Sequence, residues 1–212
     1  MESTVVEPEC AIGSEERLRL LPYKLLARYF AAPPDRELLD LSARLEGDGT
    51  PFGRALAALA AAAAEATPEG VEEEYQSLFI GLGRGEILPY ASYYLTGFLQ
   101  ERPLAELRIE LERLGVARAE DTAEPEDHVA ALCEVMAGLI SGAFGDGRLT
   151  TQKRFFETHM APWMGRLFAD LEKARSARLY RHVARVGRCF LEIEETAFAM
   201  IDGHEAAVSV GD

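Results

Sequence analysis

Apolar residues recur at intervals of three and four positions along most of this chain. Leu18, Leu21, Leu25 and Tyr29, for example, follow this spacing in one early segment. Side chains three or four residues apart share one face of an α-helix, so the spacing predicts helices whose apolar face is buried. The sequence contains no alternating apolar pattern long enough for a strand. It therefore predicts an all-α fold, a single-domain helical bundle.

Proline and glycine divide this pattern into separate helices. The first is expected to run from Ser14 to the pair Pro33-Pro34, and Asp35 is expected to cap a second that passes Leu45. Flexible tails are predicted at residues 1–14 and 203–212, around a helical domain of residues 15–202. The other predicted helices cover residues 52–66, 69–80, 92–98, 104–114, 125–144, 150–174 and 178–201.

Two connections are expected to be mobile. Residues 81–86 contain three glycines and predict a flexible turn, and residues 115–123 predict a linker. Loops of this kind can act as hinges for exchange of elements between copies. The sequence is therefore compatible with a monomer or with a domain-swapped dimer.

The length and composition place the chain among cytoplasmic globular proteins. A chain of 212 residues, 48% of them apolar, is long enough to bury a core without disulfides or metals. Cys10, Cys133 and Cys189 form no paired motif, as expected in a reducing compartment. Residues 1–16 contain no Lys or Arg, so no secretory leader is predicted. The longest apolar run, residues 55–64, is too short to span a bilayer.

The net charge of −14 restricts the partners of the protein. An acidic surface repels a phosphate backbone, so nucleic acid is not an expected partner. The same surface suits a basic peptide, because complementary charge accelerates encounter. Solubility alone is the more common explanation of such a charge.

The sequence shows no motif for catalysis or for a metal. His128 and Cys133 lie about 140° apart on a helix, and there is no HExxH motif and no paired Cys cluster. Gly81, Gly83 and Gly85 follow a helix without the Lys and Ser/Thr of a phosphate-binding loop. We therefore expect a protein that is not an enzyme and that has no built-in metal or cofactor.

Three segments, in their order and spacing, resemble one known family. The first is Glu72-Glu73-Glu74-Tyr75-Gln76-Ser77-Leu78-Phe79 with the loop Leu88-Pro89-Tyr90-Ala91-Ser92, and the second is Glu124-Pro125-Glu126-Asp127-His128. The third runs from Phe155 through His159 to Pro162-Trp163. Together they resemble the TorD/DmsD family of cytoplasmic chaperones for molybdenum-containing redox enzymes. The family often has Pro-Pro-Tyr-Glu-Ser where this chain has Leu88-Pro89-Tyr90-Ala91-Ser92. This difference leaves open which client enzyme the loop recognises.

The resemblance implies a specific function. A family member binds the twin-arginine leader of a molybdoenzyme precursor, assists cofactor insertion and delays export until maturation is complete. Such binding requires an apolar groove for the leader and carboxylates near its arginine pair. It is stoichiometric and involves no turnover.

The resemblance places the apolar part of the leader near Tyr75, Phe79, Pro89 and Tyr90, with Ser92 in the same loop motif. By spacing alone, Tyr75 and Phe79 are core residues; the resemblance implies that they shape the floor of a groove. Pro89 and Tyr90 are expected to be accessible, because the preceding glycines keep the loop loose.

The resemblance assigns the arginine end of the leader to Asp127, with Glu124 and His128 as helpers. A carboxylate can bind a guanidinium through two parallel hydrogen bonds, which explains a preference for arginine over lysine. By position alone, the acids around Pro125 are capping residues of the predicted helix 125–144. The charge of His128 is undetermined, because the helix start disfavours an imidazolium and the neighbouring acids favour one.

Two other functions are compatible with the same sequence. One is a NarJ-like assembly chaperone, which binds the N-terminal segment of a membrane-anchored nitrate reductase. The other is a helical scaffold or regulator that binds a folded partner. The leader-binding and NarJ-like functions both involve an N-terminal client peptide, whereas the scaffold function does not. The arginine pair of the peptide distinguishes the first two.

Overall fold

The computed structural model describes residues 13–81, 83–117 and 124–209. Within these ranges the chain is helical and contains no strand, which confirms the all-α prediction. An isolated antiparallel bridge pairs Tyr90 with His128. Most of the predicted N-terminal tail, and residues 118–123 of the predicted linker, lie outside the described residues. No helix in the described part of the chain is both long and apolar enough to cross a membrane.

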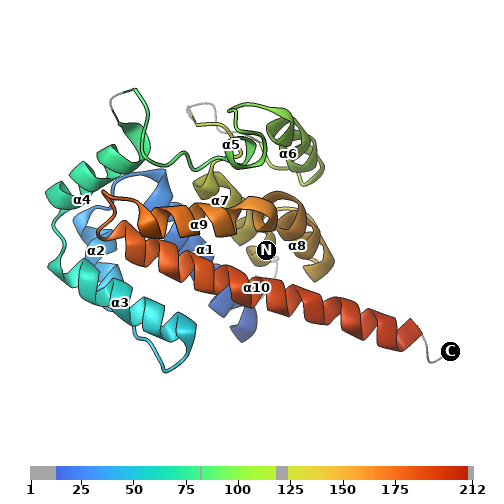
Figure 1. Cartoon of the computed structure of the whole chain (residues 1–212). Coiled ribbons are helices and arrows are strands. Elements are labelled where there is room, and N and C mark those ends of the chain that lie inside the picture. Colours follow the sequence, from blue (N-terminus) through green and yellow to red (C-terminus); the bar gives the residue numbers. More distant parts are fainter. Residues whose placement is uncertain (1–12, 82, 118–123, 210–212) are drawn as a thin grey trace, which may run out of the picture.

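Figure 1 shows the helices in their order along the chain. They are α1 (Ser14–Ala31), α2 (Arg36–Ser42), α3 (Pro51–Glu65), α4 (Pro68–Tyr75), the π-helical segment η1 (Gln76–Ile80), α5 (Ala91–Thr96), α6 (Arg102–Arg113), α7 (Val129–Ser141), α8 (Leu149–Phe155), the π-helical segment η2 (Phe156–Met160), α9 (Ala161–Lys173) and α10 (Tyr180–Ser209).

Local signals determine where several helices begin. Asp35 caps α2, as predicted, by accepting a hydrogen bond of 2.8 Å from the amide of Leu38. Thr50 caps α3 in the same way, with Pro51 in the first helical position. Thr67 caps α4. These short-range contacts explain why the starts of α2, α3 and α4 lie close to their predicted positions.

Three predicted boundaries are wrong. The helix expected over residues 125–144 begins only at Val129, because Asp127 and His128 pair with the loop before α5. The second helix ends at Ser42 and does not reach Leu45. The last helix continues past Ile201 to Ser209, so its backbone occupies much of the predicted C-terminal tail.

Part of the predicted buried face of α1 is wrong. Leu18 and Leu21 were expected to be buried, but they are 71% and 63% exposed. Tyr29 of the same predicted face is buried as expected, and so are Tyr23, Leu26 and Phe30. Spacing alone does not reveal which apolar residues of a helix its neighbours cover.

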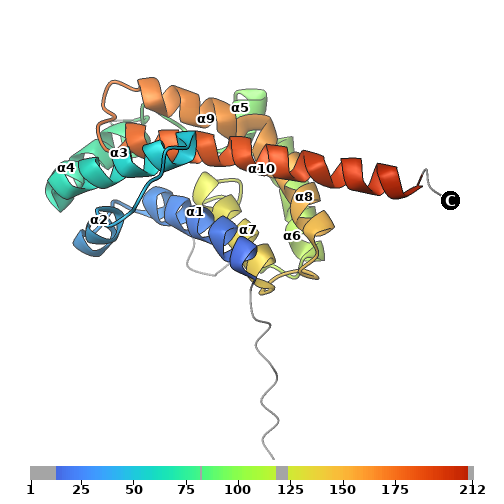
Figure 2. The same cartoon turned by 90° about the horizontal axis from the view of Figure 1, so that it is seen from below.

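α1 packs along α7, and α10 packs against α9 and α3. In Figures 1 and 2, α10 crosses the molecule and its C-terminal end projects beyond the other helices. Large side chains without solvent exposure fill the interior, among them Trp163, Phe168 and Met136. The indole of Trp163 donates a hydrogen bond of 2.7 Å to the carbonyl of His159, which satisfies its one polar group.

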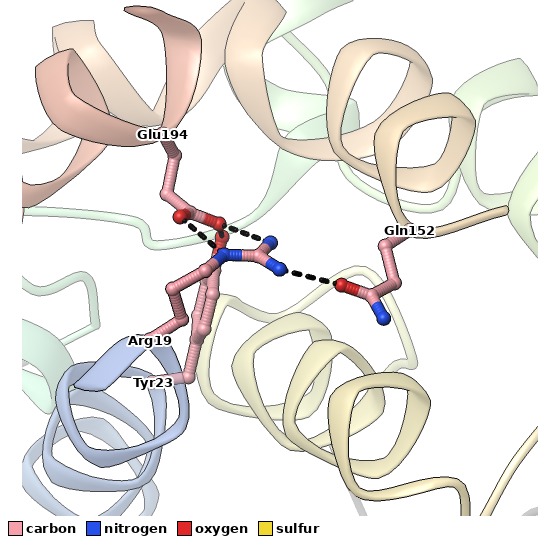
Figure 3. Close-up of polar contacts among 4 residues, drawn as sticks. All are labelled: Arg19, Tyr23, Gln152 and Glu194. Carbon is pink, nitrogen blue, oxygen red and sulfur yellow. Dashed lines mark hydrogen bonds and ion pairs between the residues drawn. The ribbon is translucent and has the colours of Figure 1, made fainter. Parts of the chain in front are cut away.

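A buried polar network links α1, α8 and α10 (Figure 3). Arg19 forms two hydrogen bonds of 2.8 Å to the carboxylate of Glu194 and one of 2.7 Å to Gln152. The hydroxyl of Tyr23 donates to the same carboxylate at 2.8 Å. Glu194 has no solvent exposure, so these contacts replace its hydration.

The glycine-containing turn after η1 is held by close contacts on its C-terminal side. A Cβ atom on Gly85 would lie 2.5 Å from the carbonyl carbon of Phe79, so only glycine fits. The amide of Ile87 donates to the carbonyl of Leu78 at 2.8 Å. Glu86 accepts hydrogen bonds from the amides of Arg175 and Ser176. Here the glycine serves close packing, where the sequence predicted a flexible turn.

Candidate peptide-binding site

The structure brings two of the sequence motifs together. The amide of Val129 donates to the carbonyl of Pro89 at 2.9 Å, and the amide of Ala91 donates to the carbonyl of Asp127 at 3.0 Å. These bonds flank the Tyr90–His128 bridge. The loop that enters α5 and the segment that enters α7 therefore form one short paired unit.

Asp127 lies inside this unit. Its side chain has no solvent exposure, and Oδ2 accepts a hydrogen bond of 2.8 Å from the amide of Ser92. The N-cap of α5, Tyr90, provides no side-chain cap, so Asp127 satisfies the amide in its place. The capping interpretation is thus wrong about the helix: the carboxylate caps α5 rather than α7. The other oxygen, Oδ1, has no hydrogen-bond partner in the described part of the chain.

His128 is the N-cap of α7. Its Nδ1 accepts a hydrogen bond of 3.3 Å from the amide of Ala130, which leaves the proton of the neutral ring on Nε2. Burial lowers the pKa of His128 to about 4, although Glu124 and Asp127 act in the opposite direction. The imidazole is therefore neutral at pH 7, which settles the question that the sequence left open.

Tyr90 and Glu124 lie next to His128. The ring of Tyr90 packs edge-on against the imidazole, with 5.0 Å between the centroids. Its hydroxyl donates a hydrogen bond to Glu124. Burial and the Glu124 carboxylate both raise the pKa of Tyr90. Glu124 is solvent-exposed, so its carboxylate lies at the surface of the unit.

A cavity of about 790 Å³ lies beside this unit, and residues of α6 and α7 line much of it. Its apolar lining includes Phe30, Leu111, Val135 and Phe144. Tyr75, Glu124 and His128, three of the predicted peptide-binding residues, also line it. The cavity has the size of a typical ligand pocket.

Acidic side chains dominate the charged part of the cavity lining, which contains Glu112, Glu124, Glu126 and Glu134 against Arg108. Arg108 forms a two-point contact with Glu126: Nη2 donates to Oε2 at 2.9 Å and Nε donates to Oε1 at 3.2 Å. Burial raises the pKa of Glu134. The cavity therefore combines an apolar lining with an excess of carboxylates.

The remaining predicted residues lie behind the lining. Phe79 packs against Tyr75 and Phe30, with ring centroids 5.0 and 5.6 Å away. The hydroxyl of Tyr75 donates to the carbonyl of Phe30 at 3.2 Å, as expected for a core residue. Pro89 is buried, so the prediction that it is accessible is wrong. Ser92 is also buried, and its hydroxyl accepts a hydrogen bond from the amide of Gln100.

Sequence reasoning missed the contribution of α6. Arg108, Leu111 and Glu112 line the cavity, and so does Glu134 of α7. The apolar spacing correctly predicted a helix over this region, but it carries no information about which helix packs opposite α7. No local motif marks these residues.

The described residues contain no group of three His, Cys, Asp or Glu side chains that could hold a metal ion. Cys133 is fully buried, and burial raises the pKa of its thiol. It is therefore a core residue rather than a reactive nucleophile.

Comparison with known proteins identifies relatives of the chain. The profile of the family described as nitrate reductase delta subunit matches residues 45–169. The chaperone protein TorD of Vibrio cholerae serotype O1 (El Tor Inaba N16961) is 28% identical over 127 residues, which cover 56% of this chain and 58% of TorD. TorD of Actinobacillus succinogenes is 29% identical over 100 residues, which cover 47% of this chain and 50% of the relative. The chain spans about half the length of these two relatives.

A solved structure has a similar fold. It is described as a redox enzyme maturation protein from Archaeoglobus fulgidus, with a TM-score of 0.55 and 20% sequence identity. The likeness covers 90% of this chain and 99% of the other. The relatives are named as chaperones, in agreement with the prediction that the protein is not an enzyme. The matched profile covers more than half of the chain, which therefore belongs to the nitrate reductase delta subunit family, the TorD/NarJ group of redox-enzyme maturation chaperones.

Proposed function

We propose that the protein is a cytoplasmic chaperone that binds the twin-arginine leader of a molybdenum-containing oxidoreductase precursor. The observation that carries this proposal is the cavity of about 790 Å³, with its apolar lining and its excess of carboxylates. A twin-arginine leader has matching parts, an arginine pair beside a moderately apolar segment. While bound, the chaperone assists cofactor insertion and delays export.

The apolar part of the leader occupies the cavity along α7. Phe30, Leu111, Val135 and Phe144 provide apolar surface there. A helical segment that lays one apolar face into such a groove gains affinity from the surface it removes from water. Phe79 supports the lining from behind through its contact with Tyr75.

The arginine pair of the leader binds at the acidic end of the cavity beside His128. Glu124 is exposed there and lies within hydrogen-bond reach of Tyr90. Asp127 has no exposed surface and caps α5, so it acts by holding Tyr90 and Glu124 in position. An arginine binds a carboxylate through two parallel hydrogen bonds, and lysine lacks this geometry.

The test is calorimetric titration with synthetic leader peptides, each beside a version in which Lys-Lys replaces Arg-Arg. We expect binding at about micromolar Kd or tighter, weakened by the lysine exchange. Glu124→Gln should weaken binding of the arginine form more than that of the lysine form. Glu72→Gln, an exposed site on α4, is the matched control and should change neither.

A second variant tests the apolar part of the site. Ala131 is half-buried and lines the cavity, so Ala131→Trp should fill it and abolish binding of both peptide forms. Its unfolding midpoint shows whether the fold is retained. Wild-type protein that binds no leader at all would refute the proposal.

A NarJ-like function is the second candidate, and the description of the matched family as nitrate reductase delta subunit favours it. In that case the client is the N-terminal segment of a membrane-anchored nitrate reductase. Titration with such a peptide, without an arginine pair, distinguishes the two. Tight binding of this peptide together with no binding of twin-arginine leaders would select the second candidate.

A further inference from the structure

The basic residues of this acidic chain are concentrated in one segment. Residues 173–188 contain six of the 22 Lys and Arg residues and none of the 36 Asp and Glu residues. The segment comprises the end of α9, the connection after it and the first turns of α10. Such a concentration of positive charge in a chain of net charge −14 indicates a local preference for anions.

Three of these side chains follow one face of α10. Arg181, Arg185 and Arg188 are spaced by four and three residues, so they lie in one row along the helix. Arg181 and Arg185 are exposed and Arg188 is half-buried. The opposite face carries the buried residues Val183 and Phe190. The row is therefore on the surface side of α10.

A cavity of about 280 Å³ lies where this row meets the start of α3. Arg185 and Arg188 line it from α10, and Arg54 lines it from α3. Pro51 and Cys189 are also part of the lining, and Glu192 is its one carboxylate. α3 packs directly against α10, and Figure 2 shows the two helices side by side.

The arginines of this cavity differ in how their charge is balanced. Arg188 is held by Glu172 at 2.7 Å and by Glu192 at 2.9 Å. The guanidinium of Arg185 has no hydrogen-bond or ion-pair partner in the described part of the chain. Arg54 donates to the carbonyl of Gly49, which carries no net charge. Among the described residues no carboxylate forms an ion pair with Arg54 or Arg185, although the Asp48 carboxylate attracts Arg54 at longer range.

The N-terminal end of α3 also favours an anion in this cavity. Pro51 is in its first turn, and this helix of 15 residues directs its positive dipole end toward the cavity side. Asp48 lies nearby, but its carboxylate is engaged by the amide and hydroxyl of Thr50. Two positive features of independent origin, the guanidiniums and the helix end, therefore meet at one cavity.

We propose that this cavity binds a phosphate-type oxyanion, either free phosphate or the phosphate group of a small molecule. Arg54 and Arg185 bind the oxygens through charge-assisted hydrogen bonds, and Arg188 is held in place between its two carboxylates. Glu192 opposes binding, because it places a like charge at the site. The site is separate from the peptide cavity and does not depend on the proposed leader binding.

The experiment is titration of the full chain with inorganic phosphate, pyrophosphate and ribose 5-phosphate, at an ionic strength kept constant with NaCl. Calorimetry measures the affinity, and the unfolding midpoint reports stabilisation by the bound anion. The double variant Arg54→Gln/Arg185→Gln should weaken binding by about tenfold or more. Glu192→Gln should strengthen binding severalfold, by about the effect of removing one like charge.

The matched control is Arg175→Gln/Arg178→Gln. It removes the same charge from the same basic segment, at exposed positions outside the cavity lining. It should leave anion affinity within about twofold of the wild-type value. Stronger binding of ribose 5-phosphate than of phosphate would identify a phosphorylated small molecule as the ligand, and the reverse would identify the free anion.

Three results would overturn the proposal. One is the absence of any anion effect beyond that of NaCl, and another is equal weakening by the two double variants. The third is unchanged affinity in Arg54→Gln/Arg185→Gln with an unfolding midpoint, in the absence of anion, equal to that of wild type.

Discussion

At the scale of single residues, Asp127 combines burial with a capping role. Its carboxylate is fully buried, and it supplies the cap that α5 lacks at Tyr90. It belongs to the segment before α7, so one side chain couples the starts of two helices. A substitution at Asp127 therefore changes the geometry of the site even if the side chain never touches a peptide.

Asp127→Asn should destabilise the protein by about 1–2 kcal/mol, because a charge-assisted hydrogen bond is lost and a buried amide hydrogen gains no partner. Urea unfolding measures the change. Asp40→Asn, at an exposed position of α2, is the control and should stay within about 0.5 kcal/mol. Equal stability of Asp127→Asn and wild type would show that the cap at Ser92 contributes nothing.

His128 makes stability depend on pH. Its folded-state pKa of about 4 lies below its ordinary value of 6.5, so the unfolded chain binds more protons between these values. The unfolding free energy should therefore fall as pH falls from about 6.5 towards 4, by up to on the order of 3 kcal/mol. Urea unfolding at pH 7 and pH 5 measures the effect.

The control for this effect is His128→Asn, which keeps an N-cap side chain without an ionisable group. The stability difference between wild type and variant should shift in favour of the variant as the pH is lowered. A difference that does not depend on pH would mean that His128 does not titrate in this range.

At the scale of elements, the start of α10 depends on a carboxylate from another helix. Glu74 of α4 accepts hydrogen bonds from the amides of Arg178, Leu179 and Tyr180, at 2.7, 3.1 and 2.8 Å. The sequence presents Glu74 as one of three consecutive glutamates. Only the packing of α4 against the α9–α10 connection gives Glu74 a role that its exposed neighbours, Glu72 and Glu73, do not have.

Glu74→Gln should lower stability by about 1–3 kcal/mol, because the neutral amide provides one acceptor and buries an N–H₂ group. Amide hydrogen exchange at residues 178–180 should accelerate. Glu73→Gln is the matched control at an exposed position and should change neither quantity. Similar effects of both substitutions would contradict the capping role of Glu74.

At the scale of the whole molecule, Arg19 of α1 binds both Glu194 of α10 and Gln152 of α8, so the network links the first and last helices to α8 (Figure 3). Glu194→Gln should destabilise the protein by about 3 kcal/mol, because Arg19 keeps its charge while its partner loses it. The exposed pair Arg102–Glu106 offers a control, and Glu106→Gln should cost less than about 0.5 kcal/mol. Urea unfolding compares the two variants. Equal losses of stability would show that burial adds nothing to the Arg19–Glu194 ion pair.

Much of the architecture was predictable from local signals. Helix starts at Asp35, Thr50 and Thr67 were close to their predicted positions, because a cap acts over three residues of the same chain. The helical class followed from the three- and four-residue apolar spacing. The motif order was sufficient to indicate the family that the profile match over residues 45–169 shows.

What the sequence alone determined was therefore the set of helices, their approximate limits and the family. The tertiary structure decided which apolar residues of α1 are exposed, which helix Asp127 caps and which residues of α6 complete the cavity. It also decided that His128 is neutral. The physical reason is range: capping and periodicity act between neighbours in the chain, whereas burial, desolvation and partner choice arise only when distant segments pack together.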